Sequence, residues 1–177
     1  MKQVSLAAAM SIGVFAFGAG QAHAQAPEPR KSIDIGRFYQ GTWLEVARRP
    51  MSITEGCVAG STSYRLESGG IAVNDACRAG GRDGPEKSIS GNGVIIDTAT
   101  NAKLRVSYNL FITREYWILD RAADYSWFIE ASPDFSDLYI FTRKPPSKAL
   151  LARLTKRARD FGYDVSRLEF PEQPPQK

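Results

Sequence analysis

Apolar and polar residues alternate with a period of two through most of the chain between residues 42 and 143. In the segment 103–108, Leu104, Val106 and Tyr108 fall on one face, and the intervening positions are polar. Strands with one apolar and one wet face are typical of antiparallel sheets. The alternation, broken by turns rich in glycine, aspartate and asparagine, predicts eight strands of a barrel or sandwich. The strands are Thr42–Arg48, Val58–Leu66, Ile71–Arg78, Ser88–Asp97, Lys103–Tyr108, Glu115–Asp120, Tyr125–Ala131 and Asp137–Arg143.

The strand at residues 125–131 is rich in large apolar side chains. Tyr125, Trp127 and Ile129 share one face, and polar residues such as Glu130 occupy the other. We therefore expect the face with Trp127 and Ile129 to point into the sheet's interior. Phe128 is the apolar exception on the polar face, and it predicts a contact point for a helix packed outside.

One amphipathic helix is predicted after the last strand. Ser147 is a good N-cap residue, and Gly162 a good C-terminal stop. The apolar positions between them share one helical face: Leu150, Leu154, Ala158 and Phe161. This pattern predicts a C-terminal helix packed outside the sheet with its basic face in water. The alternative is a basic helix that contacts a membrane surface.

The first 24 residues predict a secretory signal peptide. Lys2 precedes an apolar run, and Ala22-His23-Ala24 supplies the small residues of a cleavage site after Ala24. The run is about 16 residues long, shorter than the roughly 20 that a membrane-spanning helix needs. We therefore expect an exported protein. Cysteine is absent near the cleavage site, so we expect no covalent lipid anchor.

The remaining chain has the length of one domain. Residues 25–34 include two prolines and predict a flexible leader, with one helical turn within Ile33–Tyr39. Residues 35–170 predict the folded domain, in which Asp164–Phe170 forms a last short strand. Residues 171–177 predict a disordered tail.

The composition excludes several classes of catalytic and metal-binding site. The net charge of +4 is small and predicts a solvated surface rather than a nucleic-acid site. The single histidine, His23, lies in the predicted signal peptide. Without it the rest of the chain cannot form a Ser-His-Asp triad, a histidine-ligated haem or most zinc sites. We expect no catalytic residue, no metal and no cofactor, and so no enzyme.

The two cysteines, Cys57 and Cys77, flank the turn signal Ser68-Gly69-Gly70. An exported protein folds in an oxidising compartment, so a disulfide between them is expected. A regular hairpin through this turn would place Cys77 nearer Gly60 than Cys57. The bond therefore predicts a bulge, or a Cys57 that lies just before the paired strand.

The sequence Gly41-Thr42-Trp43 begins the first strand, and Arg143 ends the last one. A tryptophan at this position can fill the closed end of a small barrel. A guanidinium on its ring face adds roughly 0.5–2 kcal/mol. Trp43 and Arg143 are therefore predicted to seal one end of a cup.

Three segments together resemble the lipocalins, and in particular the bacterial lipocalins related to apolipoprotein D. Residues 37–48 resemble the first lipocalin signature, Ala123-Asp124-Tyr125 the second and residues 139–143 the third. The second signature departs mildly, with Ala123 where threonine is usual. Residues 100–104 and 116–119 are similar to stretches of the bacterial branch. The resemblance covers nearly all of the chain after the predicted signal peptide.

The resemblance implies an eight-stranded up-and-down antiparallel barrel with one C-terminal helix. It also implies a carrier of a small hydrophobic ligand, in the bacterial branch a fatty acid or lysophospholipid linked to envelope maintenance. We expect a periplasmic protein, a monomer or homodimer, with peripheral contact to the outer membrane. The alternatives are a lipid-modifying enzyme on the same barrel and a pigment or tetrapyrrole carrier.

Aromatic residues of the predicted strands are the candidates for contact with the ligand. The five candidates are Tyr64, Tyr108, Tyr116, Trp127 and Ile129. Each could equally fill a core, and an eight-stranded barrel is wide enough for both roles. Three arginines, Arg65, Arg105 and Arg114, are candidate partners for an anionic head group.

Overall fold

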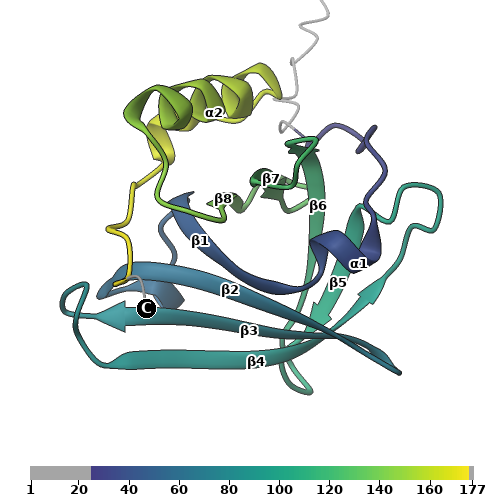
Figure 1. Ribbon diagram of the computed structural model, residues 1–177, viewed down its shortest axis with the longest axis horizontal. Coiled ribbons are helices and arrows are strands. Elements are labelled where there is room, and N and C mark those ends of the chain that lie inside the picture. Colours follow the sequence, from purple (N-terminus) through teal and green to yellow (C-terminus); the bar gives the residue numbers. More distant parts are fainter. Residues whose placement is uncertain (1–24, 176–177) are drawn as a thin grey trace, which may run out of the picture.

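The computed structural model describes residues 25–175. The predicted signal peptide and residues 176–177 lie outside the described residues. Within residues 25–175, eight strands form a closed antiparallel barrel in which each strand pairs with the next along the chain (Figure 1). They are β1 (Gly41–Arg48), β2 (Cys57–Glu67), β3 (Gly70–Ala79), β4 (Glu86–Ile95), β5 (Lys103–Ser107), β6 (Thr113–Arg121), β7 (Trp127–Ala131) and β8 (Leu138–Thr142). The predicted up-and-down barrel is confirmed.

Pairing of β8 with β1 closes the barrel, so that neither strand is left as a free edge. β1 pairs with β2 over Gly41–Glu45 and with β8 over Leu44–Arg48, with a register shift between Glu45 and Ala47. Gly41 begins β1 at a φ of 66°, a backbone conformation that residues with a Cβ rarely adopt. This is the physical reason for glycine two positions before Trp43.

The helix α2 (Lys148–Asp160) lies against the outside of the barrel (Figure 1). The side chain of Ser147 accepts a hydrogen bond from the backbone N–H of Leu150, and Gly162 follows the helix at a φ of 96°. Leu154 and Ala158 are fully buried, in one cluster with residues of β1, β6, β7 and β8. The predicted helix, its cap and its stop are confirmed.

The orientation of β7 is the reverse of the prediction. Phe128 lies inside the barrel, with its ring 4.7 Å from Trp43 and 4.8 Å from Phe38. Trp127 and Ile129 belong to the outer cluster beneath α2. Because α2 covers the outer face of β7, both faces of this strand are buried, and its apolar alternation does not indicate the inside.

The segment at residues 25–34 packs along the barrel, unlike the flexible leader predicted for it. The backbone N–H of Ala26 donates to Pro133, and that of Ile33 donates to Thr100. Both Ala26 and Ile33 are buried. The side chain of Lys31 forms a 2.6 Å ion pair with Asp120. Burial of these apolar residues offsets the entropy of ordering the segment.

The C-terminal segment also departs from its prediction. Residues 164–170 form a short 3-10 helix, η2 (Val165–Arg167), and a single bridge between Arg48 and Glu169 instead of a strand. The described part of the predicted tail lies against β2, where the N–H of Glu172 donates to Val58. Residues 171–175 are thus held by the barrel rather than free.

Candidate functional site

One end of the barrel is closed by an aromatic plug, which we define as Phe38, Tyr39, Trp43, Tyr64 and Phe128. Their rings lie within 4.7–6.3 Å of at least one other ring of the set. Phe38 comes from the short helix α1 (Ile35–Phe38), which lies across this end (Figure 1). Trp43 is completely buried.

Arg143 seals the plug from outside. The centre of its guanidinium lies 3.4 Å from the centroid of the Trp43 ring, the arrangement that the sequence predicts. One guanidinium nitrogen donates to the carbonyl of Thr42 at 3.0 Å, and another to that of Phe38 at 3.4 Å. The arginine thereby fixes α1 and β1 to the end of β8.

Above the plug the barrel encloses a cavity of about 450 Å³, within the usual range for small-ligand sites. Tyr64, Tyr108 and Tyr116 line it, whereas Trp127 and Ile129 lie outside the barrel wall and do not. The prediction that these last two line the cavity is wrong, for the reason given for β7. Ligand contact by the three tyrosines stays a prediction.

The mouth of the cavity lies at the end opposite the plug. The short 3-10 helix η1 (Ser52–Thr54), which connects β1 to β2, contributes Ile53 to the lining. Arg114 and Lys87 are exposed and also belong to the lining. The other two candidate arginines lie outside it, where Arg65 pairs with Glu67 and Arg105 with Glu115.

The cavity wall carries three carboxyl groups that the sequence analysis missed: Glu45 on β1, Asp75 on β3 and Glu130 on β7; a fourth, Glu55, is exposed at the mouth. Glu45 and Glu130 are 8% and 4% exposed, which is exceptional for acidic residues. A carboxyl in the middle of an apolar strand, as in Phe128-Ile129-Glu130-Ala131, was the available signal. By alternation alone, this carboxyl predicts the wet face of the strand.

Glu130 is the most isolated of the three. Its Oε2 atom is buried without a hydrogen-bond partner among the described residues. Burial raises the pKa of Glu130 well above its ordinary value, and repulsion from Asp75 and Glu45 raises it further. The burial of Glu130 therefore favours its protonated, uncharged form while the cavity holds no cation.

Glu45 and Asp75 each have a partner. Burial raises the pKa of Glu45 to about 7, against the opposing effect of Arg48, whose Nη1 lies 2.6 Å from Glu45 Oε1. Burial also raises the pKa of Asp75, which accepts a 2.5 Å hydrogen bond from the hydroxyl of Tyr108. Gly60 makes room for Glu45, because a Cβ at this glycine would lie 2.6 Å from Glu45 Oε1.

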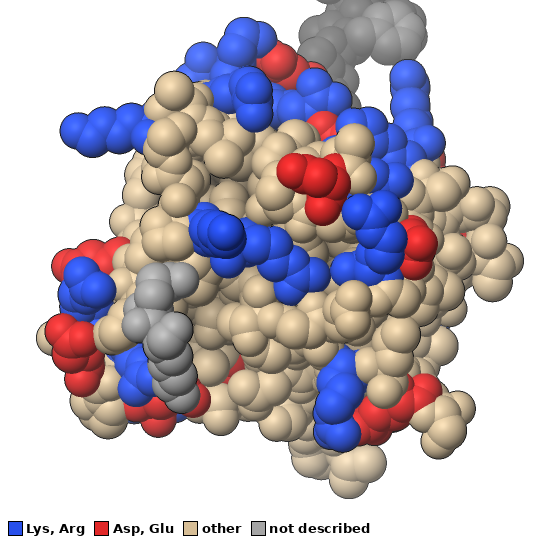
Figure 2. Space-filling view, viewed as in Figure 1, with Lys and Arg blue, Asp and Glu red and all other residues tan. Residues whose placement is uncertain are grey.

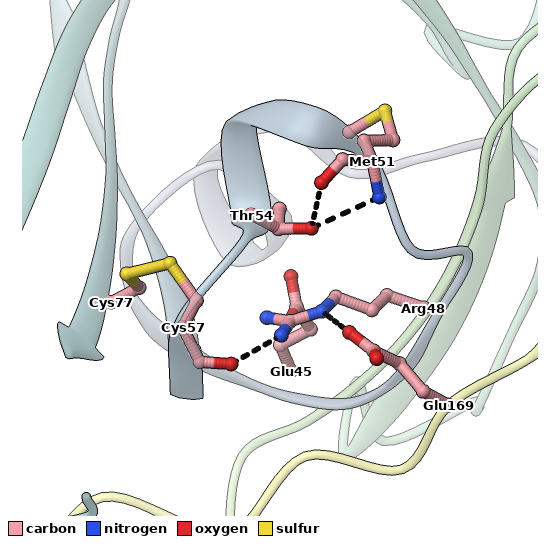
Figure 3. Close-up of a disulfide and its surroundings, with 7 residues drawn as sticks. All are labelled: Glu45, Arg48, Met51, Thr54, Cys57, Cys77 and Glu169. Atoms are coloured by element: carbon pink, nitrogen blue, oxygen red, sulfur yellow. Dashed lines mark hydrogen bonds and ion pairs between the residues drawn. A yellow bond between two sulfur atoms is a disulfide. The ribbon is translucent and has the colours of Figure 1, made fainter. Parts of the chain in front are cut away.

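Arg48 joins three parts of the chain at the mouth (Figure 3). Its guanidinium donates to Glu45, to Glu169 of the C-terminal segment and to the carbonyl of Cys57. It is only 3% exposed. The positive charge of Arg48 is therefore already balanced within the protein by Glu45 and Glu169.

The disulfide between Cys57 and Cys77 is confirmed, next to Arg48 in Figure 3. It joins the start of β2 to β3. Gly60 pairs with Cys77 in the ladder, and the register shifts between Cys57 and Ala59. Of the two alternatives that the sequence predicts, the bulge is therefore the one present, and both cysteines of the chain are in the bond.

Residues 25–175 offer neither a candidate metal-binding cluster nor a candidate membrane-spanning helix. They contain no group of three or more histidine, cysteine, aspartate or glutamate residues that could hold a metal ion. None of the helices in this part of the chain is long and apolar enough to cross a membrane.

The buried carboxyls predict an unusual dependence of stability on pH. Glu130 and Glu45 bind protons more tightly in the folded than in the unfolded state, because folding raises their pKa values. Stability is then fully present at and below the unfolded pKa and is lost as pH rises toward the folded pKa. Chemical denaturation should show lower stability at pH 7 than at pH 5, by up to about 1.4 kcal/mol per carboxyl and pH unit.

Glu130→Gln tests the assignment, because glutamine resembles the protonated carboxyl and does not titrate. The variant should have a shallower pH slope and higher stability at pH 7 than the parent. The exposed Glu67→Gln is the matched control and should keep the parent's slope. Identical slopes for all three proteins would contradict the raised pKa of Glu130.

A closed barrel, plugged by aromatic rings at one end and hollow toward the other, places the protein in the class of β-barrels with an internal cavity. The chain belongs to the lipocalin-like domain family, whose model matches residues 33–173. A protein of Acanthamoeba polyphaga mimivirus named as a lipocalin is 29% identical over 145 residues, which cover 78% of this chain and 84% of that protein.

Solved structures share the fold. Insecticyanin of the tobacco hornworm Manduca sexta aligns with a TM-score of 0.63 at 17% identity, over 85% of this chain and 87% of that one. The cockroach allergen Per a 4 aligns with a TM-score of 0.63 at 17% identity, over 86% and 96%. Lobster apocrustacyanin A1 aligns with a TM-score of 0.60 at 16% identity, over 88% and 94%.

Proposed function

We propose that this lipocalin binds and carries a small hydrophobic ligand in the cavity above the aromatic plug. The observation that carries the proposal is the hollow itself, about 450 Å³ inside a barrel whose other end is filled by Trp43. Burying an alkyl chain there would contribute about 0.8 kcal/mol per methylene before ordering costs. The family resemblance favours a single-chain lipid, either a fatty acid or a lysophospholipid.

The mouth suits an amphiphile that keeps an anionic head group near water. Arg114 and Lys87 lie there, exposed, and no ion pair with a carboxylate is found for either among the described residues. Two apolar side chains stand nearby at the β5–β6 turn, where Leu110 and Phe111 are 95% and 92% exposed. Such a rim supports peripheral contact with a lipid surface during loading.

The basic helix α2 gives less support for membrane contact. Figure 2 shows blue Lys and Arg side chains over the upper part of this face, with red acidic side chains among them. Lys156 pairs with Asp160, and Arg157 pairs with Asp120. Their charges are thus partly balanced within the protein, so the mouth is the better candidate for contact with a lipid surface.

The proposed setting is the bacterial periplasm, at the outer membrane. Its support is the predicted signal peptide, the disulfide and the resemblance to the apolipoprotein D-related bacterial branch. A purely carrying role is proposed over an enzymatic one, because both cysteines are bonded and offer no free thiol. A coloured preparation would favour the pigment carrier instead.

Filling the cavity should weaken ligand binding. Ile89 lines the cavity from β4, and Ile89→Trp would occupy the space of an alkyl chain. Displacement of the fluorescent probe N-phenylnaphthylamine by dodecanoate measures affinity, which should fall at least about tenfold, or 1.4 kcal/mol. Val94→Trp, on the same strand but 53% exposed, is the control and should bind like the parent. Equal affinity in both variants would contradict binding in the cavity.

A further inference from the structure

The proposed cavity contains a polar group without a partner. Glu130 is 4% exposed and lines the cavity, and its Oε2 has no hydrogen-bond partner among the described residues. Thr62, whose hydroxyl faces Asp75, lines the same cavity and is also buried. A buried polar atom left unpaired costs free energy. A bound ligand with hydrogen-bond donors would remove that cost.

The charged groups of the interior indicate which kind of hydrogen-bond donor the ligand would carry. Four carboxyl groups line the cavity: Glu45, Asp75 and Glu130 in its wall, and the exposed Glu55 at its mouth. The one buried cation beside them, Arg48, already donates to Glu45, Glu169 and Cys57. Arg114 and Lys87 lie exposed at the mouth. The wall around Glu130 therefore has more acidic groups than cations.

The walls are aromatic as well as acidic. Four tyrosines, Tyr64, Tyr108, Tyr116 and Tyr139, line the cavity together with the carboxyls. Ring faces attract ammonium groups, and they do so more strongly where water is excluded. A carboxylate surrounded by aromatic rings thus offers a protonated amine both an ion-pair partner and cation–π contacts.

We propose that Glu130 is the inner subsite for the ammonium group of an amine-bearing amphiphile, a single alkyl or aryl chain with a primary amine at the end that enters first. The proposal rests on the ligand-carrying function of the cavity, and it assigns an amine in place of the fatty acid or lysophospholipid that the family resemblance favours. A fatty acid would place its methyl end against the unpartnered carboxyl and leave that atom unsatisfied. An alkylamine satisfies it and places its chain against the apolar residues nearer the mouth.

The titratable groups that face Glu130 come from the surrounding strands. They are Tyr39, Glu45 on β1, Tyr64 on β2, Asp75 on β3, Tyr116 on β6, Asp137 before β8 and Tyr139 on β8. All are acids whose charged form is negative. An ammonium group would favour the carboxylate of Glu130, and the carboxyl proton would pass to water on binding. Amine binding is therefore coupled to proton release.

Three ligands of equal chain length separate the alternatives: dodecylamine, dodecanol and dodecanoate, each used to displace N-phenylnaphthylamine. At neutral pH the parent protein should bind dodecylamine at least about tenfold more tightly than dodecanol or dodecanoate. Glu130→Gln should lose that preference while still binding dodecanol. The exposed Glu67→Gln should keep it. Thermal melting of both variants would establish that they are folded.

The outcomes distinguish this inference from the proposed function. If all three ligands bind equally, or dodecanoate binds best, the amine subsite is overturned while carriage of a hydrophobic ligand stands. A preference for dodecylamine that survives in Glu130→Gln would overturn the assignment to Glu130. Failure of all three ligands to displace the probe would overturn the carrier function and this inference with it.

Discussion

Replacing Trp43 with alanine is expected to lower the free energy of unfolding by about 3–5 kcal/mol. The indole is completely buried in the aromatic plug, in contact with Phe38 and Phe128. Its removal leaves a cavity that these neighbours can only partly fill. It also removes the ring beneath the Arg143 guanidinium, which lies 3.4 Å from the ring centroid. Urea denaturation followed by circular dichroism measures the loss.

Trp117→Ala is the matched control for this prediction. Trp117 is half-buried on the outer side of β6, where the ammonium of Lys103 lies 3.9 Å from its ring centroid. It carries the same cation-over-indole contact without the burial of Trp43. Its replacement should cost less than half as much. If the two variants unfold at the same denaturant concentration, Trp43 does not close the barrel.

Removing the disulfide is expected to lower the free energy of unfolding by about 3 kcal/mol, because the unfolded chain gains conformational entropy when the loop is no longer closed. Cys57 and Cys77 are 20 residues apart in sequence. The bond also holds Cys57, whose carbonyl accepts a hydrogen bond from Arg48 at the mouth. The double variant Cys57→Ser and Cys77→Ser, measured by urea denaturation, tests the prediction.

Reduction of the parent protein provides the control for that double variant. Dithiothreitol should bring the parent to the stability of the variant and leave the variant unchanged. A parent whose unfolding is the same with and without the reductant would show that the bond adds no stability in solution.

The barrel could be predicted from the sequence because most of its strands have one dry and one wet face. In β5, Leu104 and Val106 point inward and Arg105 points out, so the alternation alone defines the inside. The same holds for the placement of Tyr108 at the cavity. The cap at Ser147 and the plug at Trp43 could be predicted because each depends on a local motif.

The acidic interior could not be predicted by the same reasoning. A charged residue in an alternating strand normally marks the wet face, because burying a charge is costly. Glu130 breaks that rule, and following it reversed the whole of β7 and assigned Trp127 and Ile129 to the cavity. Only the contacts of the folded chain, with Phe128 on Trp43 and α2 over Ile129, reveal which face is inside. This exceptional residue, Glu130, lies in the cavity wall.

The packing of the chain ends likewise could not be predicted from the sequence pattern. Ala26 and Ile33 are single apolar residues between prolines and polar residues, without a periodicity that would indicate burial. Their partners, Pro133 and Thr100, are about a hundred and about seventy residues away in sequence. Non-local contacts of this kind follow from the closed barrel rather than from local sequence.

Native mass spectrometry of the protein purified without detergent tests the central claim most directly, since that claim is that the hollow barrel holds a hydrophobic guest. The parent and Val94→Trp should each carry an added mass of one small amphiphile, released on activation in the gas phase. Ile89→Trp, with its cavity filled, should appear at the mass of the polypeptide alone. A parent protein that shows only its polypeptide mass, and still binds none of the added twelve-carbon ligands, would contradict the account.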